Sequence, residues 1–480
     1  MNHNNGSHSV WLWLRTLLAF AAILGVLLAA NSSSAQSSSQ WSLPIDITQP
    51  SGSSQGSWGL LLCDQYQNTH IFWSGSLPDG DTLYYRNNIN GGWSSPVDVV
   101  MIPDQYILRT AGAISNKTDT IHLVWTEAEQ TGGLYYSSAP LQSASDPRAW
   151  STPRKLADNT RAGSIVIDST GVIHLAYGIT DKGGQQPAVE YTRSEDDGLT
   201  WSEPVTAYAT ATSVPVQIGG VLAVDESGHI HVGITTRSIE YGIYSEVGYI
   251  RSLDGGKTWG PYFKVTNTGT TFQGVSGLVP YAFGKNEVHL TWHDPRRMHM
   301  WSNDGGQTWS APEEIMPLGA AFGGPNKLVK DSAGILHAIL AAFGGVYSVS
   351  WDGTQWGPPE LIDDRGIDPH NQDMVVCQGN ELHVTYDDRN DQKKVWYSTR
   401  TVNAPHIDPK PFPRHAEAAA IGLEPTPTPL PIRVLSGSQN HPFSPDLKSA
   451  PPSPVALILL SALPVLVLIA GVYLARRWRR

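Results

Sequence analysis

The chain has 480 residues, of which 40% are hydrophobic and only 16% are charged, and it carries a formal net charge of −11. Its 17 Trp and 18 Tyr exclude a chain that is disordered throughout, and the acidic balance argues against a nucleic-acid partner, so none is expected. The 46 Gly and 34 Pro, together with few charges, are typical of a protein built from short strands and tight turns.

The N-terminus contains an apolar run from Trp11 to Ala30, followed by serines that lead into Ser33-Ser34-Ala35. An apolar stretch with small residues behind it is typical of a secretory signal peptide. We therefore expect residues 1–35 to be a signal peptide and the rest of the chain to be exported. An uncleaved N-terminal anchor is the alternative.

A short His-led strand recurs seven times between residues 40 and 400, at spacings of 46 to 58 residues. The copies begin at His70, His122, His174, His231, His289, His337 and His383. A Trp-led element also recurs seven times, beginning at Trp41, Trp93, Trp150, Trp201, Trp259, Trp309 and Trp356. Each unit is interpreted as four strands, which predicts an all-β fold, a β-propeller of seven four-stranded blades over residues 40–400. A six-bladed propeller is the alternative. A residue present in every blade is expected to pack the blades together, so we interpret the seven histidines as structural.

The order of the two elements predicts how the ring closes. Trp41 and its followers precede the first His strand, whereas the seventh unit stops at Tyr397-Ser398 with no Trp-led strand after it. We therefore expect the N-terminal strand to complete the last blade as its outer strand. Cys63 and Cys377 occupy near-equivalent places on the innermost strands of the first and seventh units. In an exported protein they are either a disulfide across this junction or two buried thiols.

A turn sequence precedes three of the Trp-led strands. It reads Ser-x-Asp-x-Gly-x-Thr-Trp and ends at Trp201, Trp259 and Trp309, with a shortened copy around Asp352. This pattern resembles the Asp-box, or bacterial neuraminidase repeat, of the sialidase superfamily. The resemblance implies a propeller whose boxes lie on the turns between third and fourth strands, opposite the ligand face. The box aspartates are therefore expected to be structural: Asp196, Asp254, Asp304 and Asp352.

Residues that break the repeat are the candidates for function. Ligands of propellers meet the face formed by the loops between second and third strands and by the connections into each innermost strand. Candidate ligand-binding residues there are Arg109, Arg237, Glu240, Tyr241, His293, Arg296, Arg297, His370, Asp388 and Arg389, and candidate catalytic carboxylates are Asp294, Asp373 and Asp387. Because arginine forks match carboxylates, a carboxylated sugar is a suitable ligand.

Two functions are compatible with these residues. Sialidases of the superfamily that the chain resembles carry their first carboxylate-binding arginine in an Arg-Ile-Pro stretch, but here Met101 precedes Ile102-Pro103. The seven units also differ from the six blades of those enzymes. We therefore predict a surface-displayed, sialidase-like propeller that recognises glycans or proteins on its rim without sialidase chemistry. The alternative is a glycoside hydrolase, exo-sialidase-like or another glycan-cleaving propeller, that acts on extracellular glycans. An inverting hydrolase would need two carboxylates about 6.5–9.5 Å apart.

The sequence predicts no cofactor. No spacing of His, Cys or acidic residues matches a zinc site or an EF-hand loop, so no metal site is predicted, and a structural calcium ion on the rim is the one ion left open.

The C-terminal part of the sequence predicts attachment to a membrane. Residues 402–453 are rich in Pro and have no strand or helix period, which is typical of an extended stalk. Residues 455–475 carry no charge and are long enough for a transmembrane helix. The basic tail at 476–480 favours a cytoplasmic C-terminus. We therefore expect a single-pass protein of the cell membrane, with the propeller outside the cell.

Overall fold

The computed structural model describes residues 40–49, 56–78, 80–89, 91–103, 106–127, 132–179, 187–210, 216–238, 244–266, 276–294, 296–316, 327–342, 344–388 and 390–413. The predicted signal peptide, the transmembrane helix, the basic tail and the stalk beyond residue 413 lie outside these residues. Within the described ranges, no helix is both long enough and apolar enough to span a membrane. The chain divides into two units, 1–416 and 417–480, and all described residues belong to the first.

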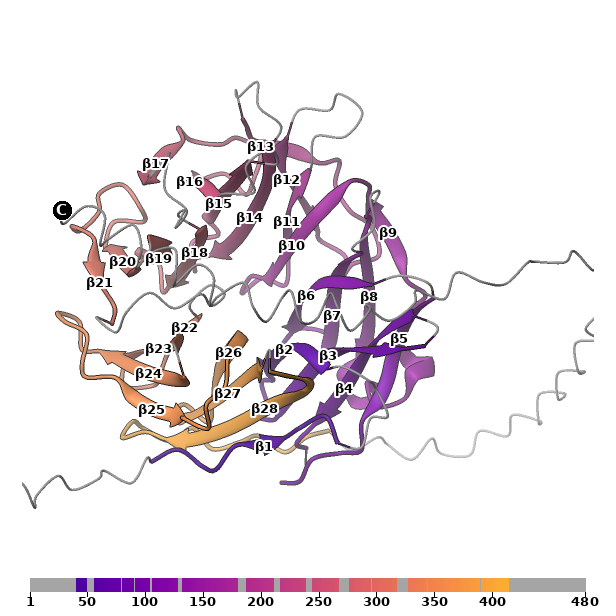
Figure 1. Ribbon diagram of the computed structural model, residues 1–480. Helices are drawn as coiled ribbons and strands as arrows, with labels where there is room; N and C mark the ends of the chain where they lie inside the picture. The colour runs from indigo at the N-terminus through magenta and orange to yellow at the C-terminus, as the bar shows by residue number, and fades with distance from the viewer. Residues whose placement is uncertain are drawn as a thin grey trace, which may run out of the picture. The chain divides into compact units, whose positions relative to one another are not determined.

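Seven four-stranded antiparallel sheets form the blades of a ring (Figure 1). This confirms the predicted all-β propeller with seven blades, and the six-bladed alternative is wrong. From the innermost strand outward, blade 1 consists of β2 (Gly56–Cys63), β3 (Thr69–Leu77), β4 (Gly80–Asn87) and β5 (Val97–Pro103). Blade 2 consists of β6 (Ile107–Ser115), β7 (Thr120–Glu127), β8 (Leu134–Pro140) and β9 (Arg154–Ala157). Blade 3 consists of β10 (Thr160–Ile167), β11 (Ile173–Ile179), β12 (Ala188–Ser194) and β13 (Val205–Ala209). Blades 4 and 5 are β14 (Val216–Val224), β15 (Ile230–Ser238), β16 (Tyr244–Ser252), β17 (Phe263–Thr266); and β18 (Ser276–Phe283), β19 (Glu287–Asp294), β20 (Arg296–Ser302), β21 (Glu313–Glu314). Blades 6 and 7 are β22 (Lys327–Lys330), β23 (Leu336–Ala342), β24 (Gly345–Trp351), β25 (Glu360–Asp363); and β26 (Pro369–Cys377), β27 (Glu381–Asp388), β28 (Asp391–Thr401), β1 (Ile45–Asp46).

The two ends of the ring differ in which connections they carry. We call the end where the second and third strands of each blade connect, and where the chain enters each innermost strand, the rim face. The opposite end carries the hairpins between first and second strands and the turns between third and fourth strands, and we call it the turn face. Because every blade is an antiparallel sheet in the same order, this assignment holds around the ring.

The second strand of each blade is packed on both sides. Every residue of β11 and of β23 is buried, because each blade is covered by a neighbour on either side, so these strands are continuously apolar apart from their histidine. The outer strands are less buried, as β9 shows with the exposed residues Arg154 and Lys155. The core therefore consists of layers between blades, which explains why the sequence repeats once per blade.

The histidine of the second strand is held by buried side-chain contacts, which blade 3 illustrates. In blade 3, His174 Nε2 lies 3.2 Å from Asp168 Oδ2, and its Nδ1 lies 2.8 Å from the Tyr191 hydroxyl. The Tyr191 ring meets the edge of Trp259 in blade 4, with ring centroids 5.5 Å apart. Because every contact of this histidine is internal, its role is to pack one blade against the next.

The N-terminal strand closes the ring. β1 pairs with β28, so that Ile45 lies opposite Tyr397, and the Ser42 N–H donates to the Thr399 carbonyl at 2.8 Å. Trp41 and Ile47, which flank this strand, are buried. The first strand in the chain is thus the outermost strand of blade 7, as the sequence predicts.

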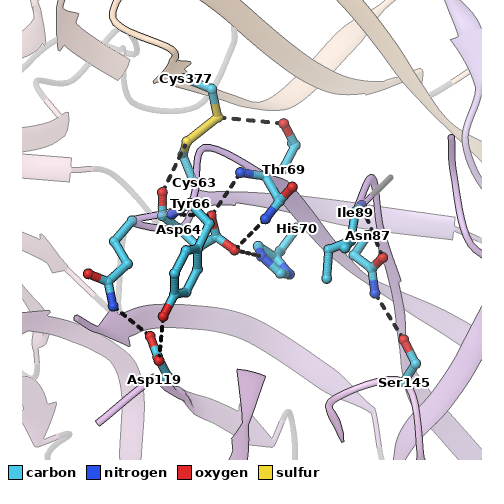
Figure 2. Close-up of polar contacts among 12 residues, drawn as sticks. Cys63, Asp64, Tyr66, Thr69, His70, Asn87, Ile89, Asp119, Ser145 and Cys377 are labelled. Atoms are coloured by element: carbon cyan, nitrogen blue, oxygen red, sulfur yellow. Dashed lines mark hydrogen bonds and ion pairs between the residues drawn. A yellow bond between two sulfur atoms is a disulfide. The ribbon is translucent and has the colours of Figure 1, made fainter. Parts of the chain in front are cut away.

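A disulfide joins the innermost strands of blades 1 and 7. Cys63 and Cys377 are 314 residues apart in sequence, with their Cα atoms 5.8 Å apart, and Figure 2 shows their sulfur atoms bonded beside the Asp64 turn. The structure thus contains the bridged form of the two forms that the sequence leaves open. The blade 7–blade 1 junction is therefore fastened both by a shared sheet and by a covalent bond.

Residues 402–413, which we call the C-terminal strap, pack on the turn face. The Ile407 N–H donates to the Gln378 carbonyl at 2.8 Å, and the Phe412 ring meets the Tyr66 ring of blade 1 at 5.3 Å between centroids. The described beginning of the predicted stalk is thus held against the propeller. Both ends of the described chain, at β1 and at β28, also leave from the turn face because of the direction of these two strands.

Candidate functional site

The topology places the described sequence candidates at the rim face. Asp294 and Arg296 flank the connection between β19 and β20, and Asp387 and Asp388 precede the connection between β27 and β28. His370 lies at the start of β26, one of the innermost strands that begin at this face. Glu240, Tyr241 and Arg389 lie outside the described residues.

Arg237 is described by its backbone alone, in β15 opposite Gln217. This strand reaches the rim face at its C-terminal end, so the backbone of Arg237 lies where the sequence places it.

Asp373 connects three blades. Its Oδ2 accepts the N–H of Leu61 in blade 1 at 2.8 Å, and its Oδ1 lies 3.0 Å from Nζ of Lys327 in blade 6. The carboxylate is buried, and a buried carboxylate is stabilised when donors and a cation surround it. The contacts of Asp373 therefore position inner strands, which is a structural task for a residue that the sequence made a catalytic candidate.

Asp387, nearer to the rim end of β27, also bonds to the innermost strand of blade 1. Its Oδ2 accepts the side-chain N–H of Asn371 at 2.7 Å and the backbone N–H of Trp58 at 3.3 Å. Trp58 belongs to blade 1, so this carboxylate also crosses the junction between blades 7 and 1. Asp387 thereby fixes the backbone position of an aromatic residue.

Trp58 is the residue that the sequence analysis missed. It has a φ of 58°, a conformation that costs a bulky residue on the order of 1–3 kcal/mol. Its half-buried side chain lies under the guanidinium of Arg109 from blade 2, with 5.3 Å between the Arg109 Cζ and the ring centroid. A strained aromatic residue held at the mouth of an innermost strand is typical of a functional position.

The strain at Trp58 comes from a bulge. The pairing of β2 with β3 shifts between Ser57 and Leu60, and an extra residue in one strand re-aims the side chains beside it. Comparable shifts occur near the rim end of four other innermost strands, β6, β10, β18 and β26. The rim face is thus built from irregular strand ends.

We call Trp58, Arg109, Lys327, Asn371, Asp373 and Asp387 the Trp58 cluster. It consists of two sets of contacts on the innermost strands and β27, Lys327 with Asp373, and Asn371 and Asp387 with Trp58 and Arg109, and its residues come from blades 6, 7, 1 and 2. Lys327 is 38% exposed at its side chain, so part of the cluster faces solvent. The cluster combines a flat apolar ring with a charged fork, the two kinds of group that bind an acidic sugar.

The candidates of blade 5 form a second group, on the connection between β19 and β20. Asp294 is paired with Arg296, and His293 with Arg297, across the two strands. Arg296 is 62% exposed and lies 3.6 Å from Glu314 Oε2. Arg297 is buried, and burial lowers the pKa of its guanidinium to about 10.

The remaining candidates of blade 7 shape its loops. Asp388 Oδ1 accepts the backbone N–H groups of Asp368 and Asn390, each at 2.9 Å. His370 Nδ1 lies 3.2 Å from the Asp368 carbonyl oxygen. Asp388 thus ties the start of β26 to the end of β27, which holds the rim connection in place.

The four Asp-box aspartates lie on the turn face, between third and fourth strands. Asp196 Oδ2 accepts the Thr200 hydroxyl at 2.5 Å, and its Oδ1 accepts the Thr200 N–H and the Ser194 hydroxyl at 2.8 Å. These hydrogen bonds, led by the one from the Thr200 hydroxyl, lower the pKa of Asp196 to about 2. Asp254 and Asp304 make the same bonds, and Asp352 makes a shorter set. All four carboxylates therefore act within their own turns.

The turns of the boxes also require glycine. Gly198 has a φ of 84°, and a Cβ on it would lie 1.8 Å from the Tyr136 hydroxyl of blade 2. The box of blade 3 is therefore pressed against the tyrosine that bonds to the histidine of the preceding blade.

Met101, the residue before Ile102-Pro103, lies on β5, the outermost strand of blade 1. Its side chain is 55% exposed. In the described ranges, no group of three or more His, Cys, Asp or Glu residues is arranged to hold a metal ion.

Comparisons with known proteins show the fold alone. No protein-family model matches the chain, and no curated protein matches it either. The solved structure of the polysaccharide lyase Uly1 is similar to 72% of this chain and 90% of its own, at 12% identity and a TM-score of 0.51. A protein of unknown function from Dyadobacter fermentans covers 75% of this chain and 98% of its own, at 13% identity and a TM-score of 0.47. The Hadza microbial sialidase Hz136 covers 74% and 68%, at 13% identity and a TM-score of 0.45. At such identities the similarity extends to the propeller and to nothing finer.

Proposed function

We propose that this protein is an extracellular, membrane-anchored propeller of the Asp-box type that binds a carboxylated glycan at its rim face and does not cleave it. The observation that carries the proposal is Trp58, whose strained backbone is held by Asp387 and whose ring lies under Arg109. A sugar ring stacks on an indole, and a guanidinium binds a carboxylate with two parallel hydrogen bonds. The likeness of the fold to a polysaccharide lyase is compatible with a glycan ligand.

The carboxylates of the cluster favour binding over hydrolysis. Glycoside hydrolysis needs one carboxyl group that delivers a proton and a second that attacks or activates water. Asp373 and Asp387 already accept backbone N–H groups from blade 1, and Asp373 also faces Lys327. These contacts fasten the two carboxylates to the scaffold, which supports recognition and leaves the hydrolase alternative to be decided by turnover.

The path of the chain suits display at a surface. The C-terminal strap leaves the propeller on the turn face, beside Gln378 and Tyr66. If the apolar segment 455–475 anchors the chain, the tether pulls on the turn face and leaves the rim face open to ligands. No cofactor is part of the proposal.

The test measures binding and turnover on the same purified full-length chain. A glycan array with carboxylated and neutral glycans is combined with a panel of fluorogenic glycosides that includes sialosides. We compare Trp58→Asn, because Asn tolerates a positive φ, Arg109→Ala, and the turn-face control Leu253→Ala, which changes a side chain that is 59% exposed.

We expect carboxylated glycans to bind the wild type and Leu253→Ala equally, and Trp58→Asn and Arg109→Ala at least about tenfold more weakly, since a loss of about 1.4 kcal/mol is tenfold in affinity. Binding that both rim variants retain would place the site elsewhere. Turnover that Asp373→Asn or Asp387→Asn abolishes would make the protein a glycoside hydrolase. If no glycan binds and none is cleaved, the glycan part of the proposal is wrong and a protein ligand becomes the alternative.

A further inference from the structure

Blade 5 breaks the repeat at one buried position. In five blades the residue opposite the second position after the conserved histidine is a tyrosine: Tyr85, Tyr136, Tyr191, Tyr249 and Tyr397. In blade 6 this position, opposite Ile339, is Ser348, and in blade 5, opposite Thr291, it is His299, the one replacement among the seven that is itself titratable. The replacement brings a second imidazole against the conserved histidine, His289.

His299 belongs to a hydrogen-bonded series of four titratable groups, two buried imidazoles between two partly exposed carboxylates. His289 Nε2 lies 3.0 Å from Glu287 Oε1, and His289 Nδ1 lies 2.8 Å from His299 Nε2. His299 Nδ1 in turn lies 2.9 Å from Glu313 Oε1. Both imidazoles are fully buried. A carboxylate therefore stands at each end of a pair of imidazoles that bond to one another.

The side-chain contacts of blade 5 need a different number of protons from those of the blades that have tyrosine. In a blade with tyrosine, one neutral histidine donates through Nε2 to a carboxylate and accepts the tyrosine O–H at Nδ1, so every contact is satisfied. In blade 5, three contacts join four groups in series through six acceptor-capable atoms, and each contact needs one proton. Two neutral imidazoles supply only two. The arrangement of Glu287, His289, His299 and Glu313 therefore requires a third proton.

A second donor competes for the atom where the third proton resides. The indole N–H of Trp356, from blade 6, points at His299 Nδ1 over 3.3 Å. If Nδ1 carries a proton, it donates to Glu313 and cannot accept from Trp356. If Nδ1 is bare, it accepts from Trp356 and faces Glu313 with a lone pair. The protonation of one atom thus selects between a partner in its own blade and a partner in the next.

Lys330 of blade 6 also contacts this series of side chains, with its Nζ 2.5 Å from Glu287 Oε2. It stabilises Glu287 as an anion and so keeps the third proton on the imidazoles. The remaining neighbours of the pair are aromatic faces, Trp301, Trp351 and Phe283. Burial lowers the pKa of His299, so the third proton leaves when the pH rises.

We infer that the His289–His299 pair is a proton-linked switch between blades 5 and 6. With the third proton bound, His299 Nδ1 holds Glu313 and with it the two-residue strand β21. When the proton passes to solvent, Nδ1 accepts the indole N–H of Trp356 and Glu313 is released. The release of Glu313 also affects the rim face, because the next residue, Glu314, pairs with the rim candidate Arg296. The inference does not depend on the proposed function.

The experiment follows the imidazole and indole nitrogens of the full-length chain labelled with ¹⁵N-histidine and ¹⁵N-tryptophan, by ¹H–¹⁵N NMR from about pH 5 to about pH 8, the range in which histidines titrate. The variant His299→Tyr restores the common pattern and identifies the signals of the pair. Glu313→Gln replaces the terminal carboxylate by an amide, which can donate to a bare Nδ1 and removes the need for a third proton. Glu314→Gln is the matched control on the same strand.

We expect one imidazolium in the wild type at low pH that becomes neutral as the pH rises, while the indole N–H signal of Trp356 shifts in step. The titration is lost in Glu313→Gln and retained in Glu314→Gln. Two imidazoles that stay neutral throughout in the wild type overturn the inference. So does a Glu313→Gln variant that titrates as the wild type does.

Discussion

The junction between blades 7 and 1 is built differently from the junction between blades 2 and 3. Blades 2 and 3 are joined by side-chain contacts: Asp197 Oδ1 lies 3.2 Å from His122 Nε2, and the Tyr136 ring meets the edge of Trp201 at 5.4 Å between ring centroids. Blades 7 and 1 add the disulfide and a strand supplied from the N-terminus. The ring is thus held by side-chain packing at the junction of blades 2 and 3, and by a disulfide and an added strand pairing at the junction of blades 7 and 1.

The difference follows from where the chain begins and ends within the ring. Covalent connectivity links blades 2 and 3, so their separation leaves them tethered and able to dock again. Blades 1 and 7 are linked through the whole propeller, and closing a long loop carries an entropic penalty that local contacts must offset. A strand from the start of the chain and a bond between Cys63 and Cys377 both act on this closure.

The largest effect is expected from removal of the closing strand. Deletion of residues 40–47 exposes the sites of Trp41 and Ile47, which are both buried, and burial of a large apolar side chain contributes about 1.5–3 kcal/mol. We expect the free energy of unfolding to fall by about 3–6 kcal/mol, as measured by denaturant unfolding. Leu43→Ala is the control in the same segment, since Leu43 is 88% exposed. Equal stability of the deletion and the wild type would contradict closure by this strand.

A smaller loss is expected from the disulfide. Replacement of both Cys63 and Cys377 by Ser removes a cross-link that closes 314 residues. Native disulfides typically contribute about 2–5 kcal/mol, mainly by restricting the unfolded chain. We expect a loss of this size in denaturant unfolding, and the same loss when the wild type is treated with reductant. Reductant should leave the double variant unchanged, and two free thiols in the mass spectrum of the untreated protein would refute the bridge.

The fold was predictable because its physical causes repeat along the sequence. A buried strand with one histidine and a turn before a tryptophan recur once per blade, and the order of Trp41 and Tyr397 shows which strand closes the ring. These features depend on local residue patterns, which a single sequence displays. The described candidates, such as Asp294 and Asp387, were likewise placed at the rim face because strand order alone decides the end of the ring at which a loop lies.

The partners of the site residues were not predictable in the same way. Asp373 was proposed as a catalytic residue, but it accepts the N–H of Leu61, more than 300 residues away in sequence, and no local pattern indicates that contact. Trp58 was missed because a bulge turns it, and a register shift depends on the pairing of two strands. The available signal was that Trp58 belongs to neither repeated element. The role of His299 was not predictable for the same reason, since only the cross-strand register shows that it replaces a tyrosine.

The smallest effect concerns an ordinary junction and depends on pH. The pKa of Asp196 in the folded protein is lowered to about 2, whereas an unfolded Asp titrates at about 3.9. A group with a lowered pKa contributes its full stability above its unfolded pKa and loses it as the pH falls through its folded pKa. Asp196→Asn lacks this ionisation, so its melting temperature should be below that of the wild type near neutrality, with the gap narrowing between about pH 4 and about pH 2.

The control is Glu195→Gln, which changes the adjacent residue, 66% exposed at its side chain, and leaves the turn intact. A constant gap between Asp196→Asn and the wild type across this range would show that the carboxylate charge plays no part in holding the turn. Glycan binding at the rim face should be the same in all three proteins near neutrality, because the turn face carries the packing of the ring and the Trp58 cluster lies at its other end.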